Sequence, residues 1–276
     1  MATLTTSDGV ELFVTEAGSG APLVILPGWG VSHRWFKEQF TAEMTSRFRV
    51  ICYDPRGQGD SEKTERGQRM GRMAADLAEV IASVGEPVHV LAWSGGGSTV
   101  LQYVELFGTG SLRSLVLVGA GPRLMKEPDW ELGFLELADA KNWVDLIRDD
   151  VNVAMRSLAP QFFAGDPAEE LVEWAIADMV RCHPAGASRA SWDFLNADYR
   201  DVLDRIDVPT LVVSGDQDVS VPAGNAPYLH EHISGSRLEV IEDAAHCPFL
   251  EQPRAFNAAV IDFLANVVEP AEQGTA

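Results

Sequence analysis

The sequence is short of basic residues, and this shortage excludes two kinds of partner. Only 21 lysines and arginines stand against 41 aspartates and glutamates, which gives a formal net charge of -20 at pH 7. A chain with this charge repels phosphate backbones and anionic membrane surfaces. We therefore expect no nucleic-acid partner and no membrane partner.

Cysteine and long apolar runs are scarce as well. The three cysteines, Cys52, Cys182 and Cys247, are widely spaced, without the CxxC or Cys/His spacing of a disulfide framework or a zinc site. No run approaches the roughly 18 apolar residues of a membrane span, and the first residues lack the basic and apolar regions of a secretory signal. We expect a cytoplasmic protein. Because no metal, nucleotide or flavin signature occurs, we also expect no cofactor, and nothing indicates the oligomeric state.

What the sequence does contain is an alternation of buried strands and helices. At 276 residues and 46% apolar, the chain can form one large core. Several short runs of the sequence are apolar at every position, which is typical of strands in a parallel sheet. The segments between these runs have helical periodicity. The expected strands are a hairpin within 3–17 and single strands at 22–26, 49–53, 88–93, 114–118, 208–214 and 237–241. The expected helices are 32–47, 68–84, 98–107, 223–234 and 255–268.

The alternation stops after the strand at 114–118. From there to about residue 201 only helices are expected, at 131–141, 142–158, 167–182 and 187–197. We interpret 122–201 as a helical cap inserted after the sixth strand, between the two parts of the core, 1–121 and 202–268. The last residues, 269–276, have too little apolar content to pack, so we expect them to be disordered.

Residues 88–97 (VHVLAWSGGG) predict a strand that turns sharply into a helix, with Ser94 at the corner. Such a corner strains the serine backbone and requires small neighbours, which Ala92, Gly95 and Gly96 provide. The free N–H groups of the helix would then face the serine hydroxyl. The usual motif is GxSxG, and here alanine replaces the first glycine. A single motif of this kind also occurs by chance, as a glycine-rich start of a helix.

Three polar residues, Ser94, Asp218 and His246, follow apolar strands. Because parallel strands end at one edge of a sheet, where ligands bind, we expect these residues to lie close together. A serine hydroxyl becomes an effective nucleophile when an imidazole accepts its proton, and a carboxylate behind the ring fixes its tautomer. The pattern therefore predicts a catalytic serine, histidine and aspartate. Asp216 is the alternative carboxylate.

From end to end the chain resembles the α/β-hydrolase superfamily. The resemblance lies in five ordered motifs, which are LPGWG at 26–30, DPRGQGDS at 54–61, the corner at Ser94, GDQD at 215–218 and AH at 245–246. It implies an α/β fold with a mostly parallel eight-stranded sheet flanked by helices. The chain order nucleophile, acid, histidine is the order of this fold.

The resemblance also assigns roles to residues. It implies catalytic roles for Ser94, Asp218 and His246, with Asp218 rather than Asp216 as the acid, and an oxyanion hole formed by two backbone N–H groups, those of Trp29 and Gly95. Where the family usually has histidine this chain has Pro27, which leaves open how the oxyanion loop is held. Arg56 and Ser61 are expected to hold their own loop. For the substrate pocket we expect Trp93, Leu124, Trp130 and Trp192.

Within the superfamily, residues 26–30 and 122–130 resemble small bacterial carboxylesterases and lactonases, among them pimeloyl-carrier-protein methyl esterases. This implies a serine hydrolase that cleaves a small carboxylic ester or lactone through an acyl-enzyme. Residues 33–37 also resemble cofactor-free dioxygenases of 3-hydroxy-4-quinolones. Those enzymes carry their acid after the strand that precedes the cap, where this chain reads GAGP (119–122) without a carboxylate. A third hypothesis is a non-catalytic ligand binder that retains the fold.

Overall fold

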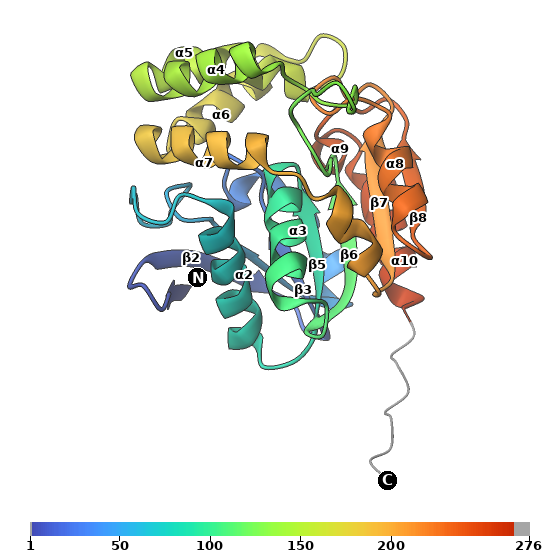
Figure 1. Ribbon diagram of the computed structural model, residues 1–276. Helices are drawn as coiled ribbons and strands as arrows, with labels where there is room; N and C mark the ends of the chain where they lie inside the picture. Colours follow the sequence, from blue (N-terminus) through green and yellow to red (C-terminus); the bar gives the residue numbers. More distant parts are fainter. Residues whose placement is uncertain (1, 268–276) are drawn as a thin grey trace.

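A computed structural model describes residues 2–267 of the chain, and they form one eight-stranded sheet with helices on both faces (Figure 1). The strand order is β1-β2-β4-β3-β5-β6-β7-β8. Strands β3 to β8 are parallel, and only the pairs β1–β2 and β2–β4 are antiparallel. The predicted sheet is therefore confirmed. The strands are β1 (Ala2–Thr5), β2 (Glu11–Ala17), β3 (Ala21–Leu26), β4 (Phe48–Tyr53), β5 (Val88–Trp93), β6 (Leu112–Val118), β7 (Thr210–Gly215) and β8 (Arg237–Ile241).

Side chains of the central strands alternate between two apolar layers, one on each face of the sheet. In β3, Leu23 and Ile25 belong to one layer, whereas Val24 and Leu26 belong to the other. This alternation explains the continuous apolar runs, because both faces are covered. One face is covered by α2 (Met70–Val84), α3 (Gly95–Phe107), η3 (Arg200–Arg205) and α8 (Asn225–His232). The other is covered by η1 (His33–Gln39), α1 (Ala42–Thr45), α9 (Pro248–Glu251) and α10 (Pro253–Ala265).

Three predicted helices, those at 32–47, 131–141 and 142–158, differ from the structure. The helix expected over 32–47 is instead the 3₁₀ helix η1, with a kink at Phe36, followed by the short α1. The helical path is interrupted at Phe36, whose φ of -97° and ψ of 22° are not helical, although Ser32 does cap the segment as predicted. The helices expected at 131–141 and 142–158 are instead Leu137–Asp149 and Val151–Leu158, because the break falls at Asp150, whose side chain caps the second helix. The predicted disorder of 269–276 lies outside the described residues.

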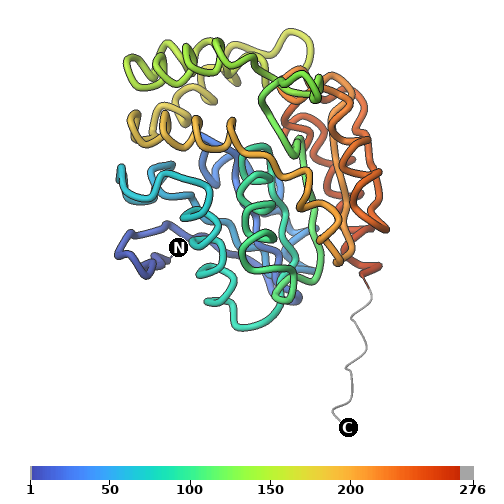
Figure 2. Tube along the Cα trace, viewed as in Figure 1, coloured from blue at the N-terminus to red at the C-terminus, as the bar shows by residue number. Residues whose placement is uncertain are grey.

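Between β6 and β7 the chain forms helices only, as predicted, and they lie together across one end of the molecule (Figures 1 and 2). These are α4 (Leu137–Asp149), α5 (Val151–Leu158), η2 (Ala159–Phe162), α6 (Glu169–Met179) and α7 (Pro184–Asn196). We call this segment the cap; its exact limits at 122 and 201 stay a prediction. No helix within residues 2–267 combines the length and apolar character needed to cross a bilayer.

A buried carboxylate fastens the cap to the core. Asp178 in α6 is 4% exposed and accepts hydrogen bonds from the backbone N–H and the hydroxyl of Ser32, at 3.0 and 2.8 Å. It also accepts one from the indole N–H of Trp35 at 2.9 Å. This carboxylate therefore fixes the start of η1 relative to the cap.

Candidate active site

Ser94 lies at the turn from β5 into α3 with a strained backbone. Its φ of 53° and ψ of -120° lie in a region that non-glycine residues rarely adopt, at a cost of about 1–3 kcal/mol. The small residues expected next to it are required by close packing. A Cβ on Gly96 would lie 2.7 Å from the carbonyl oxygen of Leu26, and a Cβ on Gly95 would lie 2.9 Å from the Cβ of Trp29.

The structure brings Ser94, His246 and Asp218 into one hydrogen-bonded chain. Nε2 of His246 lies 2.9 Å from Oγ of Ser94, and its Nδ1 lies 2.8 Å from Oδ2 of Asp218. The His246 and Asp218 side chains are 2% and 4% exposed. Asp216, the alternative acid, instead accepts a hydrogen bond from the backbone N–H of Ala244 at 3.3 Å. The structure thus places Asp218, and not Asp216, next to His246.

The environment keeps Asp218 ionised. Burial by itself raises the pKa of this carboxyl group, but His246 and the backbone N–H groups of Ser220 and Val221 outweigh it, and the pKa lies below its ordinary value. An ionised carboxylate accepts a hydrogen bond from the N–H at Nδ1 of His246. The other ring nitrogen, Nε2, is then free to accept a hydrogen bond from the Ser94 hydroxyl.

The two backbone N–H groups predicted for the oxyanion hole are neighbours. A Cβ built on Gly95 would lie 3.0 Å from the backbone nitrogen of Trp29. Within residues 2–267 neither N–H has a hydrogen-bond acceptor. Gly95 is also the first residue of α3, where the helix dipole favours negative charge. Together they can donate two hydrogen bonds to an anion next to Ser94.

The loop at 26–30, which carries the Trp29 N–H, is held by a residue that the sequence did not single out. Gln58 is 5% exposed, and its Nε2 donates hydrogen bonds to the carbonyl oxygens of Gly28 and Val31, at 3.1 and 2.9 Å. Its Oε1 accepts a hydrogen bond from the N–H of Gly30 at 2.8 Å. These bonds resolve the question raised by Pro27. The only sequence signal was the position of Gln58 inside the DPRGQGDS motif.

A cavity opens next to Ser94 and His246. Leu124 lines it, as predicted. No lysine, arginine, aspartate or glutamate belongs to the lining, which is mostly aromatic and aliphatic. The other lining residues are Trp29, Gly119, Gly121, Phe134, Leu135, Trp143, Leu158, Phe162, Phe194, Leu195, Ser220 and Val221.

The pocket assignments of Trp93, Trp130 and Trp192 were wrong. Trp93 belongs to the apolar layer on the η1 face of the sheet, where its ring stacks on that of Trp35, with centroids 5.4 Å apart, and its indole N–H donates a hydrogen bond to the carbonyl oxygen of His246. Trp130 packs edge-on against Tyr228 and is 5% exposed. Trp192 is 36% exposed on α7. None of the three lines the cavity.

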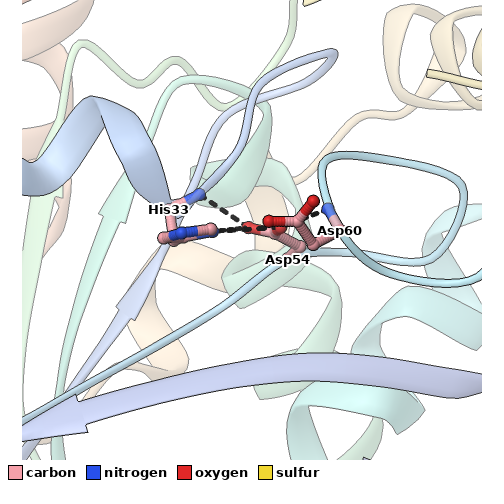
Figure 3. A group of neighbouring side chains, drawn as sticks. All are labelled: His33, Asp54 and Asp60. Carbon is pink, nitrogen blue, oxygen red and sulfur yellow. Dashed lines mark hydrogen bonds and ion pairs between the residues drawn. The ribbon is translucent and has the colours of Figure 1, made fainter. Parts of the chain in front are cut away.

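Three side chains near the loop at 26–30 lie close enough together to suggest a metal site, but their contacts explain them without a metal. The nitrogen and oxygen atoms of His33, Asp54 and Asp60 that could bind a metal ion lie within 4.8 Å of one another (Figure 3). Asp54 is buried and accepts hydrogen bonds from the backbone N–H groups of His33 and Asp60, both at 2.6 Å, and Nδ1 of His33 lies 3.0 Å from its Oδ1. Asp60 forms ion pairs with Arg34 and Arg181. These partners already satisfy both carboxylates.

The remainder of the DPRGQGDS loop is held as predicted. Arg56 is fully buried and forms ion pairs with Asp76 and Asp8, at 2.6 and 2.9 Å. The hydroxyl of Ser61 donates a hydrogen bond to the carbonyl oxygen of Asp54 and accepts one from the N–H of Phe13. These contacts hold the loop that carries Gln58 in one conformation.

Comparison with known proteins shows which family the chain belongs to. A family model described as "alpha/beta hydrolase fold" matches residues 21–253, so the chain belongs to the α/β-hydrolase family. It is 31% identical over 270 residues to a non-heme haloperoxidase of Rhodococcus erythropolis, covering 95% of this chain and 98% of that protein.

Two further relatives are esterases. A pimeloyl-[acyl-carrier protein] methyl ester esterase of Neisseria meningitidis is 32% identical over 245 residues, covering 88% of this chain and 93% of that protein. The solved structure of an esterase from Exiguobacterium antarcticum is 28% identical, with a TM-score of 0.91, and the match covers 96% of this chain and 99% of that one. The predicted resemblance to small bacterial esterases is confirmed.

Proposed function

We propose that this protein is a serine hydrolase that cleaves small carboxylic esters, including lactones, through an acyl-enzyme. Ser94 is the nucleophile, His246 the general base and acid, and Asp218 the carboxylate that orients His246. The observation that carries the proposal is the hydrogen-bonded chain from Asp218 through His246 to Ser94, beside an apolar cavity. Esterase relatives that match nearly the whole chain support the same reaction class.

The reaction follows from the geometry in two steps. As Oγ of Ser94 attacks the ester carbonyl, its proton moves to Nε2 of His246, and the N–H groups of Trp29 and Gly95 stabilise the oxyanion. The intermediate collapses when His246 returns the proton to the departing alkoxide, which leaves as an alcohol. A water molecule then attacks the acyl-enzyme by the same route, which releases the acid and restores Ser94.

The cavity limits the substrate to compact, uncharged acyl groups. Its lining contains no cationic side chain that could pair with a substrate carboxylate, and an unpaired carboxylate is costly to bury. The net charge of -20 adds a general repulsion of anions. We therefore expect turnover of neutral esters such as p-nitrophenyl butyrate, and a much lower kcat/KM for an ester that carries a free carboxylate on its acyl chain.

The dioxygenase alternative has weaker support. Its acid would follow β6, where Gly119 approaches the imidazole instead: a Cβ there would lie 3.0 Å from Nδ1 of His246. The carboxylate that contacts this nitrogen belongs to Asp218, from the loop after β7. Oxygen uptake with 3-hydroxy-4-quinolones that survives Ser94→Ala but not His246→Ala would favour this alternative over hydrolysis.

The proposal is tested with Ser94→Ala and a matched control, Ser220→Ala. Both serines line the cavity, but only Ser94 contacts His246. Ser94→Ala should abolish hydrolysis of p-nitrophenyl acetate and butyrate, whereas Ser220→Ala should retain it. A fluorophosphonate probe should label the wild type at Ser94, as read by mass spectrometry. Unchanged hydrolysis in Ser94→Ala would defeat the proposal, and a missing adduct on the wild type would favour the ligand-binder hypothesis.

A further inference from the structure

The carboxamide of Gln58 makes three hydrogen bonds to one short backbone segment. Its partners are the carbonyl oxygens of Gly28 and Val31 and the N–H of Gly30. Two acceptors and one donor fix which side of the amide group faces which partner, because only NH₂ can donate to both carbonyls. Among residues 2–267, no other side chain forms a hydrogen bond to the backbone of residues 28–31.

One of these bonds acts on the peptide group that contains the Trp29 N–H. The carbonyl of Gly28 and the N–H of Trp29 belong to the same planar peptide, which is trans. In a trans peptide the C=O and N–H bonds point in opposite directions. When Gln58 holds the oxygen of this peptide on one side, the N–H must point to the other side. Donation to the carbonyl also polarises the peptide and strengthens its N–H as a donor.

Neighbouring contacts do not replace this restraint. The indole N–H of Trp29 donates to the carbonyl oxygen of Ala187 in α7, which holds the ring and not the peptide group. Asp178 holds Ser32, beyond the loop. Pro27 has no side-chain hydrogen-bonding group and no N–H of its own. The orientation of the Gly28–Trp29 peptide therefore depends on Gln58.

We infer that Gln58 is a positioning residue of the oxyanion hole, whose carboxamide fixes the Gly28–Trp29 peptide so that the Trp29 N–H faces the oxyanion. This inference rests on the proposed ester hydrolysis and goes beyond it, since Gln58 touches neither the substrate nor Ser94. Its effect belongs to the transition state, because the oxyanion forms only there.

Two variants separate the contributions of the amide. Gln58→Met keeps the approximate shape and removes all three hydrogen bonds. Gln58→Glu keeps an acceptor for Gly30 but, when ionised, loses both donors. Complete loss of one oxyanion donor typically lowers kcat by 10²–10³, so misorientation should lower kcat by about 10- to 100-fold in both variants. KM for p-nitrophenyl butyrate should stay within about two-fold, because ground-state binding is unaffected.

A matched control comes from the same connection between β4 and α2. Gln68 is also a buried glutamine whose Nε2 donates to two carbonyl oxygens, those of Arg56 and Thr64, but it makes no bond to residues 28–31. Gln68→Met should keep wild-type kcat. If Gln68→Met lowers kcat as much as Gln58→Met, the effect is a general loosening of the loop and the inference is wrong.

A second readout distinguishes positioning from a structural role. Phenylboronic acid forms a tetrahedral adduct with the serine and places an oxygen in the oxyanion hole, so its Ki should rise in Gln58→Met by about the factor that kcat falls. The inference is overturned if kcat and this Ki both stay at wild-type values while Ser94→Ala abolishes turnover. Turnover that survives in Ser94→Ala would show instead that the proposed function has failed.

Discussion

Asp218 contacts His246 with one carboxylate oxygen only. Oδ2 lies 2.8 Å from Nδ1 of the imidazole, while Oδ1 accepts the backbone N–H groups of Ser220 and Val221 at 2.8 and 3.0 Å. The two oxygens therefore have different partners. The position of Oδ1 requires a hydrogen-bond acceptor, because two backbone N–H groups point at it. This requirement fixes the orientation of an asparagine side chain at position 218.

For this reason Asp218→Asn should invert the imidazole tautomer. The amide oxygen will take the place of Oδ1, so the NH₂ group will donate to Nδ1 of His246 and move the ring proton to Nε2. That nitrogen can then no longer accept the Ser94 proton, and kcat should fall by about 10³- to 10⁴-fold. Steady-state hydrolysis of p-nitrophenyl butyrate measures this. Asp216→Asn is the control; a larger loss there would transfer the role of the acid to Asp216.

Acyl-chain preference should depend on Trp143 and not on Trp192. Trp143 lines the cavity and packs edge-on against Trp29, with ring centroids 6.0 Å apart, whereas Trp192 does not line the cavity. Trp143→Ala enlarges the cavity, so the ratio of kcat/KM for p-nitrophenyl octanoate to that for the butyrate should rise about ten-fold. Trp192→Ala should leave the ratio unchanged. Equal ratios in both variants would contradict the assigned lining.

Removing the carboxylate of Asp178 should destabilise the protein. Asp178→Ala leaves the N–H and hydroxyl of Ser32 and the indole N–H of Trp35 buried without their acceptor. We expect the free energy of unfolding to fall by about 3 kcal/mol, measured by urea denaturation. Asp166→Ala, at an exposed position of the same segment, should change it by less than about 0.5 kcal/mol. Similar losses in the two variants would disprove the role of Asp178 as a fastening point.

Stability in mild acid should depend on His89. Burial, with a smaller effect of Arg113, lowers the pKa of this histidine from 6.5 to about 4 in the folded protein. The unfolded chain therefore binds a proton more readily, so the contribution of His89 is intact above about pH 6.5 and is lost as the pH falls towards about 4. By about pH 4.5 the loss should reach about 2 kcal/mol.

The measurement compares urea unfolding at about pH 7 and about pH 4.5. His89→Gln, which can still bond to the hydroxyl of Ser114, should lose less stability between the two pH values than the wild type does. His230→Gln changes an exposed histidine and should follow the wild type. Identical acid losses in wild type and His89→Gln would contradict the lowered pKa.

Much of the fold follows from local sequence patterns. The strands were predictable because a strand covered on both faces is apolar at every position, as in β3. The positions of Ser94, Asp218 and His246 were predictable because the ends of parallel strands share one edge of the sheet. By contrast, the prediction of a helix from residue 131 overlooked Gly133. This glycine lies so close to Lys126 that a Cβ on it would be 2.3 Å from the backbone nitrogen of Lys126.

The details of the site depend on tertiary contacts that the sequence does not display. Trp93 precedes Ser94 on β5, and its indole packs on the η1 side of the sheet. The orientations of Trp130 and Trp192 depend on how the cap docks, which no short-range period determines. Gln58 was missed because an uncharged amide in a loop has no distinguishing pattern until its three backbone partners surround it.

The backbone of His246 forms hydrogen bonds to both the cap and the core. Its N–H donates to the carbonyl oxygen of Phe162 in the cap at 3.1 Å, and its carbonyl accepts the indole N–H of Trp93, the neighbour of Ser94, at 2.8 Å. A cap that swings away as a rigid lid must therefore break a bond to the residue that performs the proton transfers. Thermal inactivation and detachment of the cap should consequently share a single melting transition.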